Sequence, residues 1–162
     1  LTVFAAVEQL RMRGFDLNDE AVHQGLQHVC QLTGLMGRWQ KLGELPTVIC
    51  DTGHNEAGIR LVVQQIAQTP HRKLHMVFGV VNDKDVTSIL KLLPTSARYY
   101  FAKASVERAL DAVQLQQLAA EAGLHGDAFP TVNQAFEAAR AQAQTDDLIF
   151  IGGSTFVVAD IL

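Results

Sequence analysis

The sequence has little of what marks several large classes of protein. Its two cysteines, Cys30 and Cys50, form no C-x-x-C pair, so nothing indicates a disulfide framework and a reducing cytoplasm is expected. No apolar run approaches the roughly 18 residues of a membrane span. Glu8, Arg11 and Arg13 interrupt the first apolar positions, which is unlike a signal peptide. We therefore expect a cytoplasmic protein with no membrane partner.

Basic residues are too few to favour nucleic acid as a partner. Thirteen Lys and Arg residues stand against 17 Asp and Glu residues, which gives a formal net charge of −4 and a pI near 5.8. A protein that binds the phosphate backbone needs a basic face. Apolar residues make up 48% of the chain and the mean hydropathy is +0.11, so the chain can bury a substantial core.

Two phosphate-binding motifs are absent from the whole sequence, which has no G-x-x-x-x-G-K-[ST] and no G-x-G-x-x-G. The histidines also lack the spacing that is typical of metal ligands. His71 and His75 are four residues apart, but Pro70 denies them a shared helical face, and His23 and His28 are five apart. We expect no metal site built from this chain alone.

From residue 38 onwards strands and helices alternate. Apolar runs predict strands at 39–42, 47–50, 73–78, 97–101 and 148–151, and at most a short strand at 129–132. Helical spacing of apolar residues predicts helices at 55–68, 86–93, 110–122 and 135–143. The first two strands are too close for a crossover and should pair antiparallel. The expected fold class is α/β, a Rossmann-like, mostly parallel sheet with helices on both faces and one antiparallel edge strand.

The beginning of the chain follows a different pattern, because two helices precede the alternation with no strand between them. They are expected over residues 1–13 and 18–32, each stopped by a glycine. We place a domain boundary at about residue 36, so that 1–36 is helical and 37–162 is the Rossmann-like domain. A helical prologue packed on the same core is the alternative.

One stretch joins a buried strand to a polar turn, Thr47-Val48-Ile49-Cys50-Asp51-Thr52-Gly53-His54-Asn55. The apolar run stops at Asp51, and Asn55 can cap the helix that follows. Asp51 and His54 therefore lie at the carboxyl end of a strand, where open α/β sheets bind ligands. A turn whose acid and histidine only satisfy nearby backbone groups explains the spacing equally well.

Other candidate groups follow the later strands. They are Asn82, Asp83, Lys84, Lys103, Ser105, Ser154 and Thr155. Parallel strands bring such loops to a common edge, so we expect these groups to converge. The Asp83-Lys84-Asp85 segment is equally compatible with a capped, solvated helix start. After Gly152-Gly153-Ser154 the second glycine of G-x-S-x-G is missing, which disfavours a hydrolase.

Four short motifs occur in order along the chain. They are Gly37-Arg38-Trp39-Gln40, Asp51-Thr52-Gly53-His54-Asn55, Phe78-Gly79-Val80-Val81-Asn82-Asp83-Lys84-Asp85 and Gly152-Gly153-Ser154-Thr155-Phe156, with a weaker echo in Arg108-Ala109-Leu110-Asp111. This set resembles the C-terminal domain of folylpolyglutamate synthases, which belong to the Mur ligase superfamily. Gly53 stands where that family usually has alanine, and Glu56 where it usually has proline.

The resemblance implies an activity and roles for particular residues. It implies that the whole enzyme uses ATP and Mg²⁺ to activate a folate carboxylate as an acyl phosphate, which the amine of L-glutamate attacks. By the same resemblance Arg38 and Asp51 bind ATP, His54 binds ATP close to the reacting groups as the catalytic candidate, and Ser154 contacts glutamate. A possible site loop contains Asn55, Asp83 and Lys84.

The resemblance also implies a missing partner domain. In that family the P-loop and most of the Mg²⁺ site belong to a preceding ATPase domain, so residues 1–36 are expected to be its helical tail. Residues 37–162 would be the C-terminal domain, inactive alone. A bifunctional dihydrofolate synthase and another Mur ligase are nearby alternatives. A non-catalytic Rossmann-like binding module is a more distant one, and it leaves the four ordered motifs unexplained.

Overall fold

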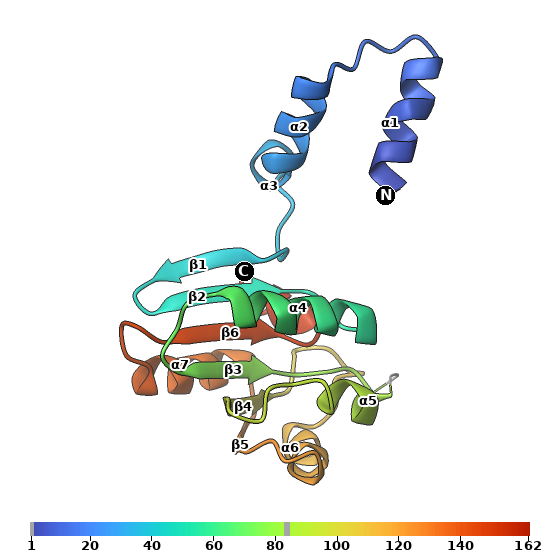
Figure 1. The fold of residues 1–162 in the computed structure, drawn as a ribbon. Coiled ribbons are helices and arrows are strands. Elements are labelled where there is room, and N and C mark those ends of the chain that lie inside the picture. Colours follow the sequence, from blue (N-terminus) through green and yellow to red (C-terminus); the bar gives the residue numbers. More distant parts are fainter. Residues whose placement is uncertain (1, 83–84) are drawn as a thin grey trace. The chain divides into compact units, whose positions relative to one another are not determined.

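The computed structural model describes residues 2–82 and 85–162, so Asp83 and Lys84 of the predicted site loop lie outside the described residues. The chain divides into two compact units, Leu1–Met36 and Gly37–Leu162 (Figure 1). Within the described part, no helix is long and apolar enough to cross a membrane.

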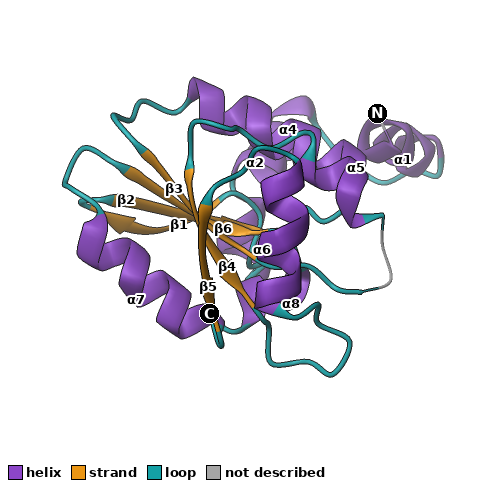
Figure 2. Ribbon diagram, turned by 90° about the horizontal axis from the view of Figure 1, so that it is seen from below, coloured by secondary structure: helices purple, strands orange, loops and turns teal. Residues whose placement is uncertain are grey.

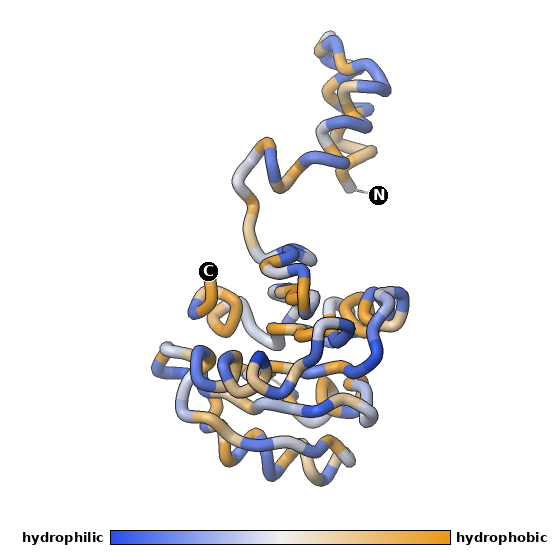
Figure 3. Tube along the Cα trace, turned by 90° about the vertical axis from the view of Figure 1, so that its left-hand side faces the viewer, coloured by the Kyte–Doolittle hydropathy of each residue, from blue (hydrophilic) through white to orange (hydrophobic). Residues whose placement is uncertain are grey.

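The first unit consists of three helices in its described part, α1 (Thr2–Met12), α2 (Asp19–Gln27) and α3 (Val29–Thr33). None of these helices contains a buried residue. Hydrophobic and hydrophilic residues alternate along their trace (Figure 3). Residues 2–36 therefore form no hydrophobic core of their own.

The second predicted helix is broken at His28, and this part of the prediction is wrong. His28 has φ −111° and ψ 21°, outside the helical range. Its Nδ1 lies 3.0 Å from the Gln24 carbonyl, the same carbonyl that accepts the His28 backbone N–H. A side chain that bonds a local carbonyl in this way competes with the helix. Gly34 ends α3 in the left-handed conformation, as expected for a glycine stop.

The second unit is built on a six-stranded sheet with the order β1-β2-β6-β3-β4-β5. The strands are β1 (Gln40–Glu44), β2 (Thr47–Asp51), β3 (Leu74–Phe78), β4 (Arg98–Ala102), β5 (Gly126–Phe129) and β6 (Leu148–Gly152). The edge strand β1 is antiparallel to β2, and every other neighbouring pair is parallel. The predicted fold class is confirmed.

Helices cover both faces of this sheet. They are α4 (Glu56–Gln68), α5 (Val86–Leu90), α6 (Ala112–Glu121), α7 (Val132–Gln142) and α8 (Thr155–Ala159). The strands separate α4 from α7 (Figure 2). Buried residues of α4, α5 and α6 share one core, and those of α7 and α8 share the other. The sheet is therefore sandwiched, as a mostly parallel sheet requires.

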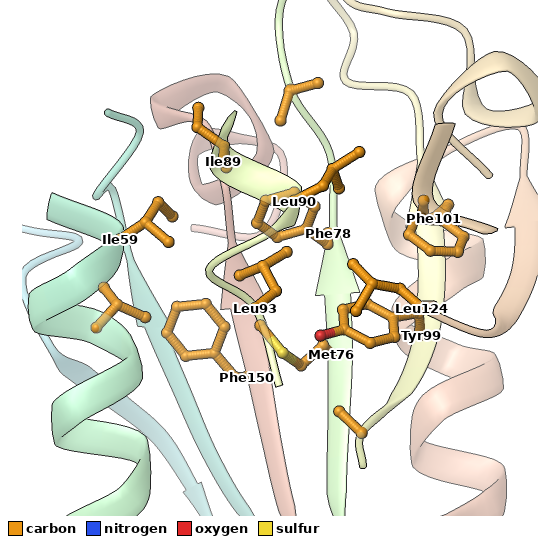
Figure 4. Packing of buried hydrophobic residues seen from close by; sticks show 14 of the residues in the cluster. Ile59, Met76, Phe78, Ile89, Leu90, Leu93, Tyr99, Phe101, Leu124 and Phe150 are labelled. Atoms are coloured by element: carbon orange, nitrogen blue, oxygen red, sulfur yellow. The ribbon is translucent and has the colours of Figure 1, made fainter. Parts of the chain in front are cut away.

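Neighbouring strand residues alternate between the two cores. Met76 and Phe78 pack with Phe150 under α4 and α5 (Figure 4), whereas Val77 packs with Ile151 under α7. This period of two follows from the pleat of a strand. All five residues are fully buried. Because both faces of the sheet are covered by apolar cores, the central strands appear in the sequence as continuous hydrophobic runs.

The predicted strand at 129–132 is displaced in the structure. The strand β5 ends at Phe129, and α7 already begins at Val132. Thr131 causes this early start, because its hydroxyl accepts the N–H of Gln134 at 3.2 Å and caps the helix. The predicted strand includes Pro130 and Thr131, which form a turn in the structure.

Candidate functional site

An open pocket of about 320 Å³ lies where β2 ends. Its lining consists of Arg38, Asp51, Thr52, Gly53, His54, Asn55, Gly58, Leu61, Val62 and Gln65. Asp51 pairs with Gly152 of β6 in the sheet register, so the pocket is at the carboxyl edge. Four residues proposed from the sequence, Arg38, Asp51, His54 and Asn55, therefore line one pocket.

Asp51 ties two loops together at this edge. Its Oδ2 accepts the backbone N–H of Trp39 at 2.7 Å, and its Oδ1 accepts the N–H of Gly53 at 2.7 Å. The backbone-satisfying role considered for this acid is therefore present. A carboxylate offers about four lone-pair sites, so two acceptor positions remain for a ligand hydroxyl pair.

The motif Gly37-Arg38-Trp39-Gln40 is a strained turn bonded to the end of β2. Gly37 and Trp39 both have positive φ, 69° and 43°, which is uncommon for a bulky residue such as tryptophan. The Gly37 N–H donates to Gln40 Oε1 at 2.7 Å, and its carbonyl accepts the Thr52 N–H at 2.9 Å. The turn thus fixes the backbone of Arg38, whose side chain is exposed at the pocket.

The close packing around residue 37 also requires a glycine. A Cβ at this position would lie 2.8 Å from Thr52 Cγ2 and 3.0 Å from Val158 Cγ1. The Thr52 hydroxyl oxygen is buried with no hydrogen-bond partner among the described residues. An unsatisfied buried hydroxyl in a pocket wall is a reason to suspect a ligand contact. Sequence reasoning missed Thr52, and only its place inside the Asp51–Asn55 motif pointed to it.

His54 has a defined orientation. Its Nδ1 lies 2.9 Å from the Thr52 carbonyl, which can only accept, so Nδ1 carries a proton. In the neutral ring Nε2 is then an acceptor, and protonation would turn it into a donor. Asn55 caps α4 as predicted, because its Oδ1 accepts the Gly58 N–H at 2.8 Å.

Ser154 lies on the neighbouring strand exit and does not line this pocket. It is 2% exposed, and its Oγ accepts the Phe156 N–H at 3.1 Å, which caps α8. Gly153 has φ 94°, and a Cβ there would lie 2.7 Å from the Gly79 carbonyl oxygen. Gly153 therefore allows the exits of β6 and β3 to approach each other closely, whereas a Cβ at Gly152 would lie 2.8 Å from the Asp51 carbonyl oxygen of β2.

The expected convergence of all the strand exits is only partial. Lys103 lines a separate pocket of about 280 Å³, with Asp111 and Phe129 in its wall. Ser105 bonds to the carboxylate of Asp160. Among residues 2–82 and 85–162, no group of three or more His, Cys, Asp or Glu side chains could hold a metal ion.

Cys50 is placed where the sequence predicted, in the core of β2. It is fully buried, and burial, together with the charge of Asp51, raises the pKa of its thiol to about 11. A thiol that is buried and protonated at neutral pH is poorly suited to act as a nucleophile.

A second polar cluster lies at the opposite, amino edge of the sheet. The His75 ring lies 2.9 Å from the Tyr100 hydroxyl through Nδ1 and 3.3 Å from Asp147 Oδ2 through Nε2. Tyr100 donates to Gln142 Oε1 at 3.0 Å, and Arg72 lies 3.1 Å from Asp147. Burial alone would raise the pKa of Asp147, but hydrogen bonds from the backbone and His75, with the Arg72 charge, hold it below its usual value.

Comparison with known proteins identifies the class. The family described as "Mur ligase, glutamate ligase domain" matches residues 37–155. This is most of the second unit, and it includes the strained turn, the pocket and the Ser154 cap. The chain belongs to this family of Mur ligase domains.

Individual proteins of similar sequence indicate which members of the family the chain resembles. A Haloferax volcanii protein named "probable bifunctional folylpolyglutamate synthase/dihydropteroate synthase" is 32% identical over 96% of this chain and 18% of its own length. The Escherichia coli dihydrofolate synthase/folylpolyglutamate synthase is 29% identical over 97% of this chain and 36% of its own length. The chain therefore spans well under half of either relative. Both names contain the activity implied by the four motifs.

A solved structure gives the same likeness. The bifunctional folylpolyglutamate synthase/dihydrofolate synthase from Yersinia pestis, complexed with AMPPNP and a Mn ion, is 31% identical and superposes with a TM-score of 0.80. The match covers 96% of this chain and 36% of that one. That relative binds an ATP analogue and a divalent metal.

Proposed function

We propose that the chain is the C-terminal part of a cytoplasmic, ATP-dependent folylpolyglutamate synthase. The whole enzyme adds L-glutamate to a folate through an acyl-phosphate intermediate. Residues 37–162 are the glutamate ligase domain, and residues 1–36 are the helical tail of a preceding ATP-binding domain. The sequence contains no P-loop, so the chain alone is inactive. The three described helices of the first unit contain no buried residue, and this supports a packing partner elsewhere in the enzyme.

One observation carries this proposal: the strained turn at Gly37 presents Arg38 at the pocket that holds Asp51 and His54. A guanidinium fork suits a phosphate oxygen. The remaining lone pairs of Asp51 suit a pair of ribose hydroxyls. His54 is oriented by the Thr52 carbonyl and can place a donor or an acceptor near the reacting groups. The set fits the nucleoside side of ATP.

The same residues do not make a magnesium site. Mg²⁺ requires several oxygen ligands in octahedral geometry, and no acidic cluster is present among the described residues. In the proposed enzyme the preceding domain would hold most of the Mg²⁺ ligands, and the ion would supply positive charge beside the phosphates. This chain's contribution is to bind and orient the nucleotide and to close over it.

We place the binding site of the substrate L-glutamate in the loop that follows β6. The Ser154 hydroxyl accepts from Phe156 and still has one proton to donate to a carboxylate. Asn55 supports the site by capping α4, and Asp83 and Lys84 remain candidates from the sequence alone. The amine of glutamate attacks the acyl phosphate, the C–N bond forms, and phosphate leaves.

The test is ATP-dependent incorporation of L-glutamate into tetrahydrofolate by the full-length protein, beside the chain 1–162. Product from the first and none from the second is expected. Asp51→Ala should raise the KM for ATP, whereas Ser154→Ala should mainly raise the KM for glutamate. The reverse pattern would overturn these assignments. No product from a folded protein, with folates and cell-wall precursors both tried, would favour a non-catalytic binding module.

The name of the Escherichia coli relative includes dihydrofolate synthase, which favours this as a second activity. The same assay with dihydropteroate in place of tetrahydrofolate tests it. Product with both acceptors would show a bifunctional enzyme.

A further inference from the structure

The pocket at the end of β2 has a second wall, to which the proposed function gives no role. This wall is one face of α4 and consists of Gly58, Leu61, Val62 and Gln65. Their spacing of i, i+3, i+4 and i+7 makes them neighbours on the surface of the helix. At 1.5 Å per residue, this α4 wall is about 10 Å long. Gly58 is at the end near the polar loop, and Gln65 is about two turns further along.

Two glycines join the α4 wall to the polar side of the pocket. A Cβ at Gly58 would lie 3.3 Å from the Cα of Gly53, and a Cβ at Gly53 would lie 3.0 Å from Asp51 Oδ1. No side chain therefore stands between the turn after β2 and the first turn of α4. A group that is bound through Asp51 can extend along the helix toward Leu61, which lines the same pocket.

The middle of the α4 wall is apolar and uncharged. Leu61 is 63% exposed, although its neighbour Val62 is buried. The two charged residues of α4, Glu56 and Arg60, pair with each other at 2.7 Å and do not line the pocket. Ligand pockets are lined mainly by apolar side chains with a few polar groups that fix orientation. This part of the pocket suits an uncharged group with an apolar face.

The far end of the α4 wall carries the amide of Gln65. The backbone carbonyl of this residue accepts the Thr69 hydroxyl at 2.8 Å, and its side chain is exposed at the pocket. A glutamine amide offers a donor and an acceptor next to each other. Adenine presents the complementary pair, the N6–H donor and the N7 acceptor, and glutamine can bond to both at once.

We propose that the α4 wall binds the adenine base of the nucleotide, with Leu61 against the face of the ring and Gln65 on its N6 and N7 edge. These two residues select adenine over purines that carry an oxygen at position 6. The inference rests on the proposed function, in which Asp51 binds the ribose hydroxyls and Arg38 a phosphate. A base attached to that ribose is flat and uncharged and has a hydrogen-bonding edge, which are the properties that the wall suits.

The experiment measures the Kd of the full-length protein for ADP and for IDP by isothermal titration calorimetry, without folate or glutamate. IDP has an oxygen in place of the 6-amino group, so this edge of its base carries two acceptors, as in guanine. Wild type should bind ADP on the order of tenfold more tightly than IDP. Leu61→Ala should raise both Kd values alike, about fivefold to tenfold, because apolar burial is lost. Its melting temperature should stay that of wild type, since Leu61 is exposed.

Variants of Gln65 test the reading of the base edge. Gln65→Leu should raise the Kd for ADP on the order of tenfold and the Kd for IDP less, so that the preference for ADP disappears. Gln65→Lys presents donors alone, which match the two acceptors of IDP. This variant should bind IDP more tightly than ADP, a reversal that a general loss of structure could not produce.

The chain offers a matched control for each position. Gln64→Leu makes the same change one residue earlier in α4, at an exposed glutamine that does not line the pocket. Leu45→Ala removes an exposed leucine from the turn between β1 and β2, also outside the pocket. Both controls should bind ADP and IDP as wild type does.

Three results would overturn the inference. The variants Leu61→Ala and Gln65→Leu could keep the wild-type Kd values, or Gln64→Leu could weaken ADP binding as much as Gln65→Leu does. A raised KM for tetrahydrofolate with an unchanged Kd for ADP would assign the α4 wall to the pteridine ring of the folate.

The same measurements separate this inference from the proposed function. Adenine-selective ADP binding by a wild-type protein that ligates no glutamate would defeat the proposed function alone. A folded wild-type protein that ligates glutamate but binds ADP and IDP equally well would defeat the inference alone.

Discussion

The two edges of the sheet in the second unit use polar residues in opposite ways. At the amino edge His75, Tyr100 and Asp147 bond to one another and are at most 5% exposed. At the carboxyl edge Asp51 and His54 are bonded to backbone groups and face an open pocket. An acid and a histidine that bond to each other in the core stabilise the fold, whereas the same residue types in the wall of a pocket can contribute to a binding site.

The largest effect is expected from a substitution in the buried polar cluster at the amino edge of the sheet. Asp147→Asn removes the buried carboxylate that bonds to His75 and faces the partly exposed Arg72, and it should destabilise the purified chain by about 2–3 kcal/mol, because hydrogen bonds to a charged, buried acceptor are lost. Urea denaturation of wild type and variant at neutral pH measures this. The matched control is Asp146→Asn, whose exposed carboxylate also pairs with Arg72 and which should cost less than about 1 kcal/mol.

The same pair predicts a pH dependence. The folded-state pKa of Asp147 lies below its usual value, so its stabilisation is complete above the unfolded pKa of about 3.9 and is lost as the pH falls through the folded value. The stability difference between wild type and Asp147→Asn should therefore shrink only below about pH 4. A difference that already shrinks between pH 7 and 5 would contradict the assignment to this carboxylate.

A smaller effect is expected from a substitution at the carboxyl edge of the sheet. Asp51→Asn places an amide NH₂ against one of the two N–H groups that the carboxylate accepts. The KM of the full-length protein for ATP should rise about tenfold to a hundredfold, because the turn carrying Arg38 loses its anchor. Asp111→Asn is the control, since asparagine caps a helix as well as aspartate does. Equal KM values for wild type and Asp51→Asn would remove Asp51 from the site.

Gly34 and Gly37 have the same backbone conformation but different surroundings, so substituting each by alanine compares backbone strain with close packing. Their φ angles are 68° and 69°, but a Cβ at Gly34 meets nothing within 4 Å, whereas one at Gly37 meets Thr52 and Val158. Gly37→Ala should cost about 1–3 kcal/mol more than Gly34→Ala, from overpacking. Fluorescence of Trp39, the only tryptophan, reports unfolding at the turn itself. An unchanged unfolding midpoint for Gly37→Ala would show that the space around Gly37 can accommodate a Cβ.

The smallest effect concerns the two thiols. Cys30 is exposed, whereas Cys50 is buried with its pKa raised to about 11. Iodoacetamide at pH 8 should modify Cys30 in the native chain and reach Cys50 only after unfolding, as read by mass spectrometry. Labelling of both at similar rates would mean that β2 opens readily.

Local features of the second unit could be predicted from the sequence. Apolar periodicity located most elements, the short interval after β1 indicated its antiparallel pairing, and Asn55 was recognised as a cap. These depend on neighbours in the chain. The bond from Asp51 to the Trp39 N–H joins residues 12 apart, and the closure of the turn by Gln40 depends on two unusual φ angles. Such contacts are products of tertiary structure.

The placement of Ser154 shows the same limit. Its motif marked it as a polar group at a strand exit, but the sequence could not show that its hydroxyl would cap α8 and be buried. The strand order was equally out of reach, because parallel strands of similar composition have no local signal for their neighbours. Asp51 and His54 were found because both stand in the first polar turn after a buried run.

The position of β6 has a consequence for synthesis on the ribosome. This strand is the last of the six along the chain, yet it lies between β2 and β3, which have no other contact in the sheet. Until it emerges, the nascent chain holds two separate sheet fragments with open edges, and such edges invite pairing with other chains. A premature stop shortly before Leu148 would therefore yield an aggregation-prone product in place of a slightly shortened domain.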